Sequence, residues 1–102
     1  HPTFEREVAI VHLRLPEVTS TLARQVAAAV EELRSLNLYK PPGVAETIDW
    51  AAALARLGVS ELDEQSVATT LGSVLKYRED IEAVRDETLA RLVDTARTTA
   101  AR

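Results

Sequence analysis

The chain has 102 residues, a net charge of −4 and no cysteine. Its length suits one domain rather than two, and the lack of cysteine excludes disulfides and thiolate metal sites. The acidic charge argues against a dedicated nucleic-acid binder, and the short apolar runs argue against a membrane-spanning helix. No signal peptide is visible, so we expect a cytoplasmic protein. Because the chain starts His1-Pro2 with no methionine, we take it as a piece of a longer protein.

Hydrophobic residues make up 46% of the chain and aromatic residues only 4%. A sequence rich in alanine, leucine, glutamate and arginine favours helices, because these side chains lose little rotamer freedom there. No segment alternates with a period of two, so no sheet is expected. We predict an all-α fold, a compact bundle of four to five short helices that forms a single domain over residues 1–102.

The first two helices are marked by apolar stripes at helical spacing. Thr3 can cap the first helix and Pro16 ends it, and the second begins among the polar residues before Leu22. The first stripe is Phe4, Val8, Val11 and Leu15, and the second is Val18, Leu22, Val26, Ala29, Val30 and Leu33.

A Pro-Pro-Gly sequence at residues 41–43 cannot continue the second helix. A third helix should therefore begin around Val44 to Glu46 and end before Gly58, which suits the position after a helix end. Its apolar face is broad, so we expect this helix to be central.

The fourth helix has two candidate caps, Ser60 and Asp63. Gly72, inside that helix, would permit close packing against a neighbour. A single last helix should open at Glu79 or Asp80, and we expect its polar tail, residues 95–102, to fray.

The stretch from residue 36 to residue 50 concentrates the unusual chemistry of the chain. A helix start offers free N–H groups and partial positive charge, which suit phosphate, and a lysine lies just before it. The candidate binding residues are Lys40, Gly43, Val44, Ala45 and Glu46. The alternative is an ordinary helix entry with an exposed lysine, and the residues alone favour that alternative. Leu38 and Tyr39 are expected to anchor the loop to the core.

No catalytic constellation accompanies this stretch. The sequence has no glycine-rich phosphate loop, no histidine pair at metal spacing and no Ser/His/Asp set. His12 has no second ligand placed to help it, so we interpret it as a solvated helix residue. We therefore expect no enzymatic activity from this chain alone and no cofactor or metal of its own.

Three segments carry a family resemblance: residues 4–11, residues 36–50 and residues 70–77. Together they resemble the C-terminal helical lid of a MoxR-type AAA+ ATPase, closest to the CoxD-like branch linked to carbon monoxide dehydrogenase maturation. The most specific piece is Gly-Val-Ala-Glu-Thr-Ile-Asp-Trp at residues 43–50. The resemblance runs from residue 2 to about residue 80 and covers the last helix poorly.

The resemblance implies a lid that follows a nucleotide-binding core and closes over ATP, with ATP and Mg bound by the parent protein. The third helix of such lids begins near the phosphates and usually carries the sensor-2 arginine. Here the matching region is Val44-Ala45-Glu46, which has no arginine, and Lys40 is a candidate substitute. The implied partners are the N-terminal AAA+ core of the same chain, neighbouring subunits in a ring and a von Willebrand factor A domain protein. The implied role is chaperone-like, in metalloenzyme maturation or the remodelling of complexes.

Two other functions compete with the lid. An independent helical module could bind a protein partner through an exposed apolar groove, without nucleotide. A DNA-binding helix-turn-helix is disfavoured by the acidic charge and by the lack of a basic recognition helix. We expect neither nucleic acid nor membrane among the partners.

Overall fold

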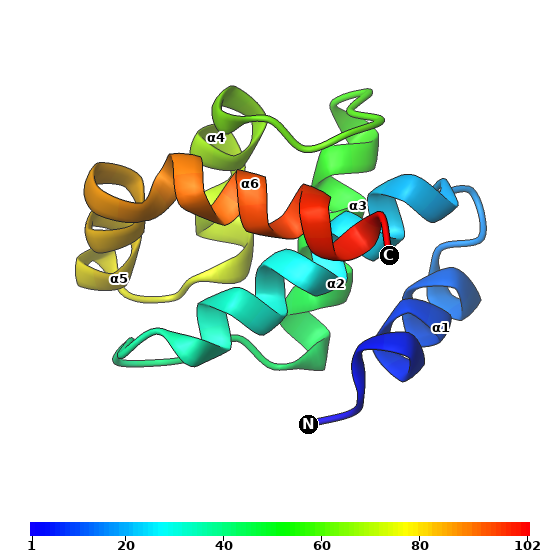
Figure 1. Cartoon of the computed structure of the whole chain (residues 1–102), viewed down its shortest axis with the longest axis horizontal. Helices are drawn as coiled ribbons and strands as arrows, with labels where there is room; N and C mark the ends of the chain where they lie inside the picture. The colour runs from blue at the N-terminus through cyan, green and yellow to red at the C-terminus, as the bar shows by residue number, and fades with distance from the viewer.

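The computed structural model describes all residues from His1 to Arg102, and every regular element in it is helical. Four α-helices are followed by a bent helical end (Figure 1). The four are α1 (Phe4–Arg14), α2 (Ser20–Ser35), α3 (Val44–Arg56) and α4 (Glu64–Val74), and the bent end consists of α5 (Arg78–Ala83), the π-helical turn η1 (Val84–Thr88) and α6 (Leu89–Ala100). If α5, η1 and α6 count as one bent helix, the bundle has five helices. The prediction of an all-α bundle of four to five helices is confirmed.

Helix ends follow the chemistry expected from the sequence. The side-chain oxygens of Thr3, Thr19 and Asp63 accept hydrogen bonds from backbone N–H groups in the first turns of α1, α2 and α4. Gly58 has a φ of 76°, and its N–H and that of Val59 donate to carbonyls of the last turn of α3. That pattern closes a helix with a left-handed residue, which glycine adopts without strain.

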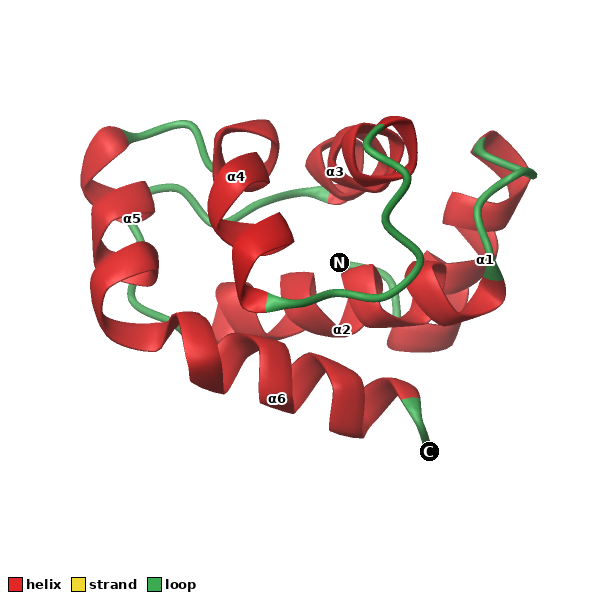
Figure 2. Cartoon of the chain, turned by 90° about the horizontal axis from the view of Figure 1, so that it is seen from above, coloured by secondary structure: helices red, strands yellow, loops and turns green.

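The core is built around α2, not around α3 as predicted. Nine residues of α2 are buried, against four of α3. Each of the two helices packs against three others, but the contact of α2 with α6 is the most extensive in the fold. Figure 2 shows α2 between α6 on one side and α3 on the other. Leu57, the apolar residue directly after the end of α3, is 58% exposed. The alanine-rich centre of α2 brings its neighbours close, and this close approach makes α2 the central helix.

Trp50 is the largest fully buried side chain. It lies on α3, and its Nε1–H donates to the hydroxyl of Thr70 on α4 at 2.7 Å. The Thr70 hydroxyl in turn donates to the Ser66 carbonyl at 2.7 Å. The indole therefore fills core volume while its one polar group keeps a partner.

Two expectations for the second half of the chain are wrong. Gly72 is exposed, and a Cβ there would meet nothing within 4 Å, so it permits no close packing. The last helix is not single: it starts at Arg78, passes through the π-turn and changes direction where Thr88 has a φ of −129°. Figure 2 shows α5 and α6 running in different directions. A π-turn is a recognised cause of such a bend.

The tail also differs from expectation, because α6 continues to Ala100. Ala96 is fully buried, and the Nε of Arg24 donates to the Ala100 carbonyl at 3.0 Å. This side chain satisfies one of the carbonyls left without a partner at the end of a helix.

None of the helices combines the length and the apolar character that crossing a bilayer requires.

Candidate functional site

The candidate site lies where the chain turns from α2 into α3. Along this turn Tyr39 is 76% exposed, Lys40 and Pro41 are also exposed, and Pro42 is buried. Leu38 packs against the core as expected, but Tyr39 does not, so that half of the anchoring prediction is wrong. The tip of the turn, residues 39–41, is thus open to solvent, whereas its base at Pro42 is buried.

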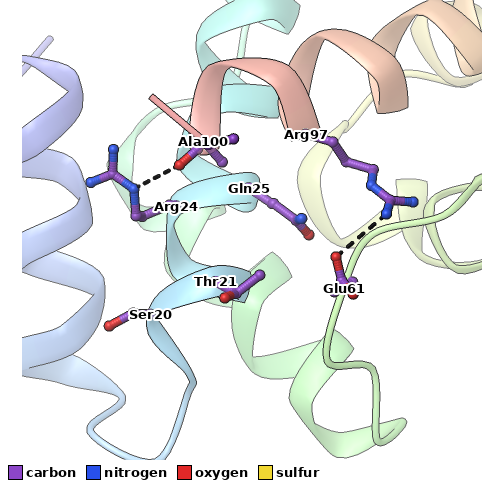
Figure 3. Close-up of a pocket in the computed structure, with 8 residues that line it drawn as sticks. Ser20, Thr21, Arg24, Gln25, Glu61, Arg97 and Ala100 are labelled. Carbon is purple, nitrogen blue, oxygen red and sulfur yellow. Dashed lines mark hydrogen bonds and ion pairs between the residues drawn. The ribbon is translucent and has the colours of Figure 1, made fainter.

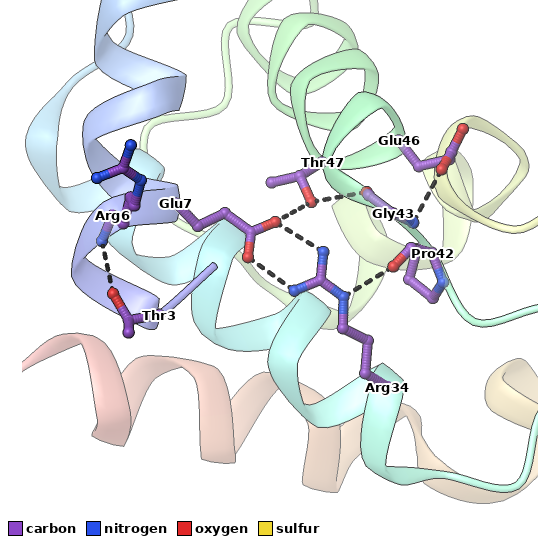
Figure 4. A network of polar contacts seen from close by, with 8 residues as sticks. All are labelled: Thr3, Arg6, Glu7, Arg34, Pro42, Gly43, Glu46 and Thr47. Atoms are coloured by element: carbon purple, nitrogen blue, oxygen red, sulfur yellow. Dashed lines mark hydrogen bonds and ion pairs between the residues drawn. The ribbon is translucent and has the colours of Figure 1, made fainter. Parts of the chain in front are cut away.

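A buried ion pair holds the base of the turn (Figure 4). Arg34, near the end of α2, donates from Nη1 and Nη2 to the two carboxylate oxygens of Glu7 on α1, at 2.7 and 2.8 Å. Its Nε donates to the Pro42 carbonyl at 2.8 Å. The Thr47 hydroxyl of α3 donates to Glu7 Oε2 at 2.6 Å. Four segments of the chain therefore meet on one glutamate–arginine pair, and this pair sets where α3 begins.

The start of α3 is closed by its own side chain. Glu46 Oε1 accepts from the Gly43 N–H at 2.8 Å, which is the half of a capping box that a glycine cap permits. The N–H groups of Val44, Ala45 and Glu46 belong to the first turn, which has no carbonyl of its own helix to bond. Ala45 is exposed and Val44 is half-buried, so this turn faces outward.

A second carboxylate holds the tip of the turn from the other side. Asp80, only 2% exposed, accepts from the backbone N–H groups of Tyr39 and Lys40 at 2.9 and 3.0 Å. The Tyr39 ring stacks on the ring of Tyr77, with 6.2 Å between centroids. Loop and helix are therefore joined by two backbone hydrogen bonds and one aromatic pair.

These contacts decide what the candidate residues can do. Lys40 takes part in none of the ion pairs of the chain, so its ammonium group is free to meet an anion. The Gly43 N–H already donates to Glu46, and the negative charge of the Glu46 carboxylate repels a phosphate at the same helix start. No group of three acidic or histidine side chains is placed to hold a metal ion. The geometry thus offers one free cation and an outward-facing helix turn to an anionic ligand.

Sequence reasoning missed Glu7, Arg34 and Asp80. Glu7 lies between Phe4, Val8 and Val11 on the apolar stripe of α1, and a charge on such a stripe signals a buried partner. Asp80 matches the pattern of a helix start, and that pattern does not indicate that its carboxylate binds the backbone of Tyr39 and Lys40. Arg34 carries no such local signal, because only the crossing of α1 over α2 brings it to Glu7.

A pocket of about 380 Å³ lies at the opposite end of α2 from the turn (Figure 3). Its two guanidinium groups are both engaged: Arg24 binds Glu5 and the Ala100 carbonyl, and Arg97 lies 3.5 Å from Glu61. The side-chain oxygen of Gln25 accepts a hydrogen bond from the Leu62 N–H at 2.7 Å. This pocket therefore holds polar groups that mostly bind one another and presents no free cation.

Comparison with known proteins finds no relative. No family model, no curated protein and no solved structure matches this chain. The resemblance to MoxR-type lids over residues 4–11, 36–50 and 70–77 therefore stays a prediction.

Proposed function

We propose that this chain is the C-terminal helical lid of a MoxR-type AAA+ ATPase. In this role it closes over ATP bound by a preceding core and transmits the nucleotide state to partner proteins. The metalloenzyme-maturation or remodelling role of the CoxD-like branch is part of the same proposal.

One observation carries the proposal: the three segments that resemble the lid meet in space. Thr47 of the middle segment binds Glu7 of the first, and Trp50 of the middle segment binds Thr70 of the last. Tyr39 of the middle segment stacks on Tyr77 of the last. The three segments therefore meet in one part of the fold, the turn between α2 and α3 with the residues that support it.

The physical role of that surface is coupling. A lid can shift the balance between an open and a closed state only if its contacts differ between them. A turn fixed by Glu7, Arg34 and Asp80 passes a displacement at its exposed tip to three helices instead of absorbing it. Lys40 supplies a cation for the phosphates, and the first turn of α3 begins shortly after it in the chain, at Val44. ATP and Mg belong to the core.

The partners follow from the same proposal. They are the AAA+ core of the same polypeptide, the neighbouring subunits of a ring and a von Willebrand factor A domain protein. The coding sequence upstream of residue 1 should then encode a Walker A motif. An upstream region without a nucleotide-binding core would contradict the proposal.

Lys40→Ala tests the nucleotide contact in the chain joined to its core. We expect binding of a fluorescent ATP analogue to weaken about tenfold, the loss of one good charged contact. Lys76→Ala is the matched control, because Lys76 is the only other lysine of the chain. Equal affinities for the two variants would remove Lys40 from the proposed site. Measurable ATP turnover by residues 1–102 alone would contradict the lid assignment itself.

A further inference from the structure

Gln25 of α2 is a buried polar side chain whose donors have no partner in the chain. The residue is 4% exposed, and its Oε1 accepts from the Leu62 N–H at 2.7 Å. That bond fixes the orientation of the amide, because only the oxygen can accept, and it leaves the two N–H donors of Nε2 unused. No fully enclosed side-chain nitrogen or oxygen lacks a hydrogen bond, so Nε2 reaches solvent. A buried amide that keeps two donors free marks a place where a ligand can bind.

The free donors of Gln25 face the pocket of about 380 Å³ beside the start of α2. Figure 3 shows the Gln25 side chain extending into the space between Thr21, Arg97 and Glu61. Ser20 and Thr21 add two exposed hydroxyls from the first turn of α2, which carries no acidic residue. Only two of the eight lining residues are hydrophobic. The pocket therefore suits a small hydrophilic molecule rather than the mainly apolar ligands that most pockets of this size bind.

The charged groups that line the pocket cancel in pairs. Arg24 is fully engaged, because it binds Glu5 at 3.1 Å and donates to two backbone carbonyls near the end of the chain, at 3.0 and 3.3 Å. Arg97 and Glu61 lie 3.5 Å apart, with side chains 50% and 56% exposed. An exposed ion pair at this distance contributes little to stability. The Arg97–Glu61 pair is therefore loose enough to exchange part of its contact for a ligand.

The surroundings of the pocket disfavour a net anion. Three exposed carboxylates, those of Glu17, Asp63 and Asp94, belong to the segments that form the pocket, although none of them lines it. Arg102, which lines the adjoining pocket with Arg24, is a further cation at this end of the bundle. These four groups add a net negative charge, and the chain as a whole carries −4. A multiply charged anion such as phosphate is repelled here, whereas a molecule whose own charges cancel is not.

We propose that this pocket binds a free α-amino acid in its zwitterionic form. The α-carboxylate accepts from the guanidinium group of Arg97 and from Gln25 Nε2, and the α-ammonium group donates to Glu61. The opposite charges of an amino acid lie side by side, as those of Arg97 and Glu61 do, so one ligand pairs with both residues at once. Its side chain lies along the hydroxyls of Ser20 and Thr21, which favours a polar side chain. The site needs neither nucleotide nor a preceding core, so it stands or falls separately from the lid function.

The test uses residues 1–102 and L-glutamine as the probe, with binding measured from amide shifts in NMR titrations. Two analogues each lack one charge: N-acetyl-L-glutamine has no ammonium group, and L-glutamine α-amide has no carboxylate. We expect L-glutamine to bind with a Kd of about 1 mM or below, and each analogue to bind about tenfold more weakly because it loses one charged contact. The shifts should change at Thr21, Gln25 and Leu62.

Three outcomes of this titration would overturn the proposal. The first is the absence of any shift at about 20 mM L-glutamine, which excludes even weak binding. The second is equal binding of the three compounds, because it would mean that neither charge of the ligand is recognised. The third is tighter binding of either analogue, which would favour a site for a single charge instead.

Three variants locate the site. Glu61→Gln should abolish the preference for L-glutamine over its N-acetyl analogue, whereas Glu64→Gln, the same change on an exposed residue outside the pocket, should not. Arg97→Gln should abolish the preference over the α-amide. Gln25→Glu keeps an oxygen for the Leu62 N–H but replaces the free donors by negative charge, so L-glutamine should bind at least about tenfold more weakly.

Far-UV circular dichroism checks that each variant is folded. Should Gln25→Glu fail to fold, the two half-exposed positions 61 and 97 still decide the question. Equal effects of Glu61→Gln and Glu64→Gln on the preference for L-glutamine would overturn the proposal.

Discussion

Two arginines of α2 each bind a glutamate of α1, yet their surroundings differ. Arg34 binds Glu7 through two parallel hydrogen bonds, and the side chains are 11% and 2% exposed. Arg24 binds Glu5 at 3.1 Å, and these side chains are 24% and 72% exposed. The residue types and the two helices are the same. Burial, together with the added hydrogen bonds to Pro42 and Thr47, makes the first pair a structural requirement for the turn, while the second pair remains a replaceable surface contact.

The largest effect should come from breaking the buried pair. Glu7→Ala leaves the Arg34 guanidinium without a counter-charge and the Thr47 hydroxyl without its acceptor. We expect the free energy of unfolding to fall by about 3–5 kcal/mol, as for other half-broken buried ion pairs. Urea denaturation at neutral pH measures the change. The double variant Glu7→Leu/Arg34→Met removes both charges and should recover part of the loss; a double variant less stable than Glu7→Ala would contradict this account.

A smaller effect should follow from removing one bond to the same pair. Thr47→Val keeps the side-chain shape but cannot donate to Glu7, so a buried carboxylate oxygen loses a partner. We expect a loss of about 1–3 kcal/mol in the free energy of unfolding. Thr69→Val in α4 is the control, because its exposed hydroxyl donates only to a carbonyl of its own helix. Equal losses at the two positions would show that the contact to Glu7 adds nothing.

The fold was largely predictable from the sequence, because its helices carry local signals. The caps at Thr3 and Asp63, the start of α3 and the turn at Gly58 each depend on residues a few positions apart. The errors arise where distant parts meet. That α2 is central depends on α6 lying along it, and that the tail is helical depends on Arg24 reaching Ala100.

The candidate site was predictable only in part, for the same reason. The sequence marks an exposed turn with a free lysine, and the structure keeps Lys40 in that state. It does not show that Asp80 crosses to the turn or that Arg34 and Glu7 fix its base. Those contacts join residues far apart in the chain, and no spacing rule connects them.

The exposed end of the bundle offers a pH-dependent comparison with the buried pair. Hydrogen bonds from the backbone and side chain of Ser66, with a smaller contribution from Arg97, hold the pKa of Asp63 below its ordinary value of 3.8. The Asp63 carboxyl group therefore loses its proton more readily in the folded state than in the unfolded state. The stabilisation is complete above the ordinary pKa and is lost as the pH falls through the folded value.

Asp63→Asn keeps a capping side chain and removes the charge. The melting temperatures of the two proteins should differ by a constant amount at neutral pH, with the unmodified protein higher. The difference should shrink as the pH falls below the ordinary pKa of aspartate. Arg97→Gln should change this profile less than Asp63→Asn does, because Arg97 is a minor cause of the shift. A difference that grows on acidification would reverse the sign of the argument.

The smallest effect should come from Glu5→Ala, at about 0.2–1 kcal/mol, and it should vanish at high salt because the pair is exposed. Arg24→Ala should cost more than this. Its guanidinium also donates to the Ala100 carbonyl and lies 5.0 Å from the centre of the Phe4 ring. A double-mutant cycle between the two positions separates the ion pair from these other contacts. A coupling as large as that between Glu7 and Arg34 would mean that burial does not distinguish the two pairs. A small coupling beside a large loss for Arg24→Ala would mean that this arginine holds the end of α6 by its contact to Ala100 and its packing rather than by its charge partner.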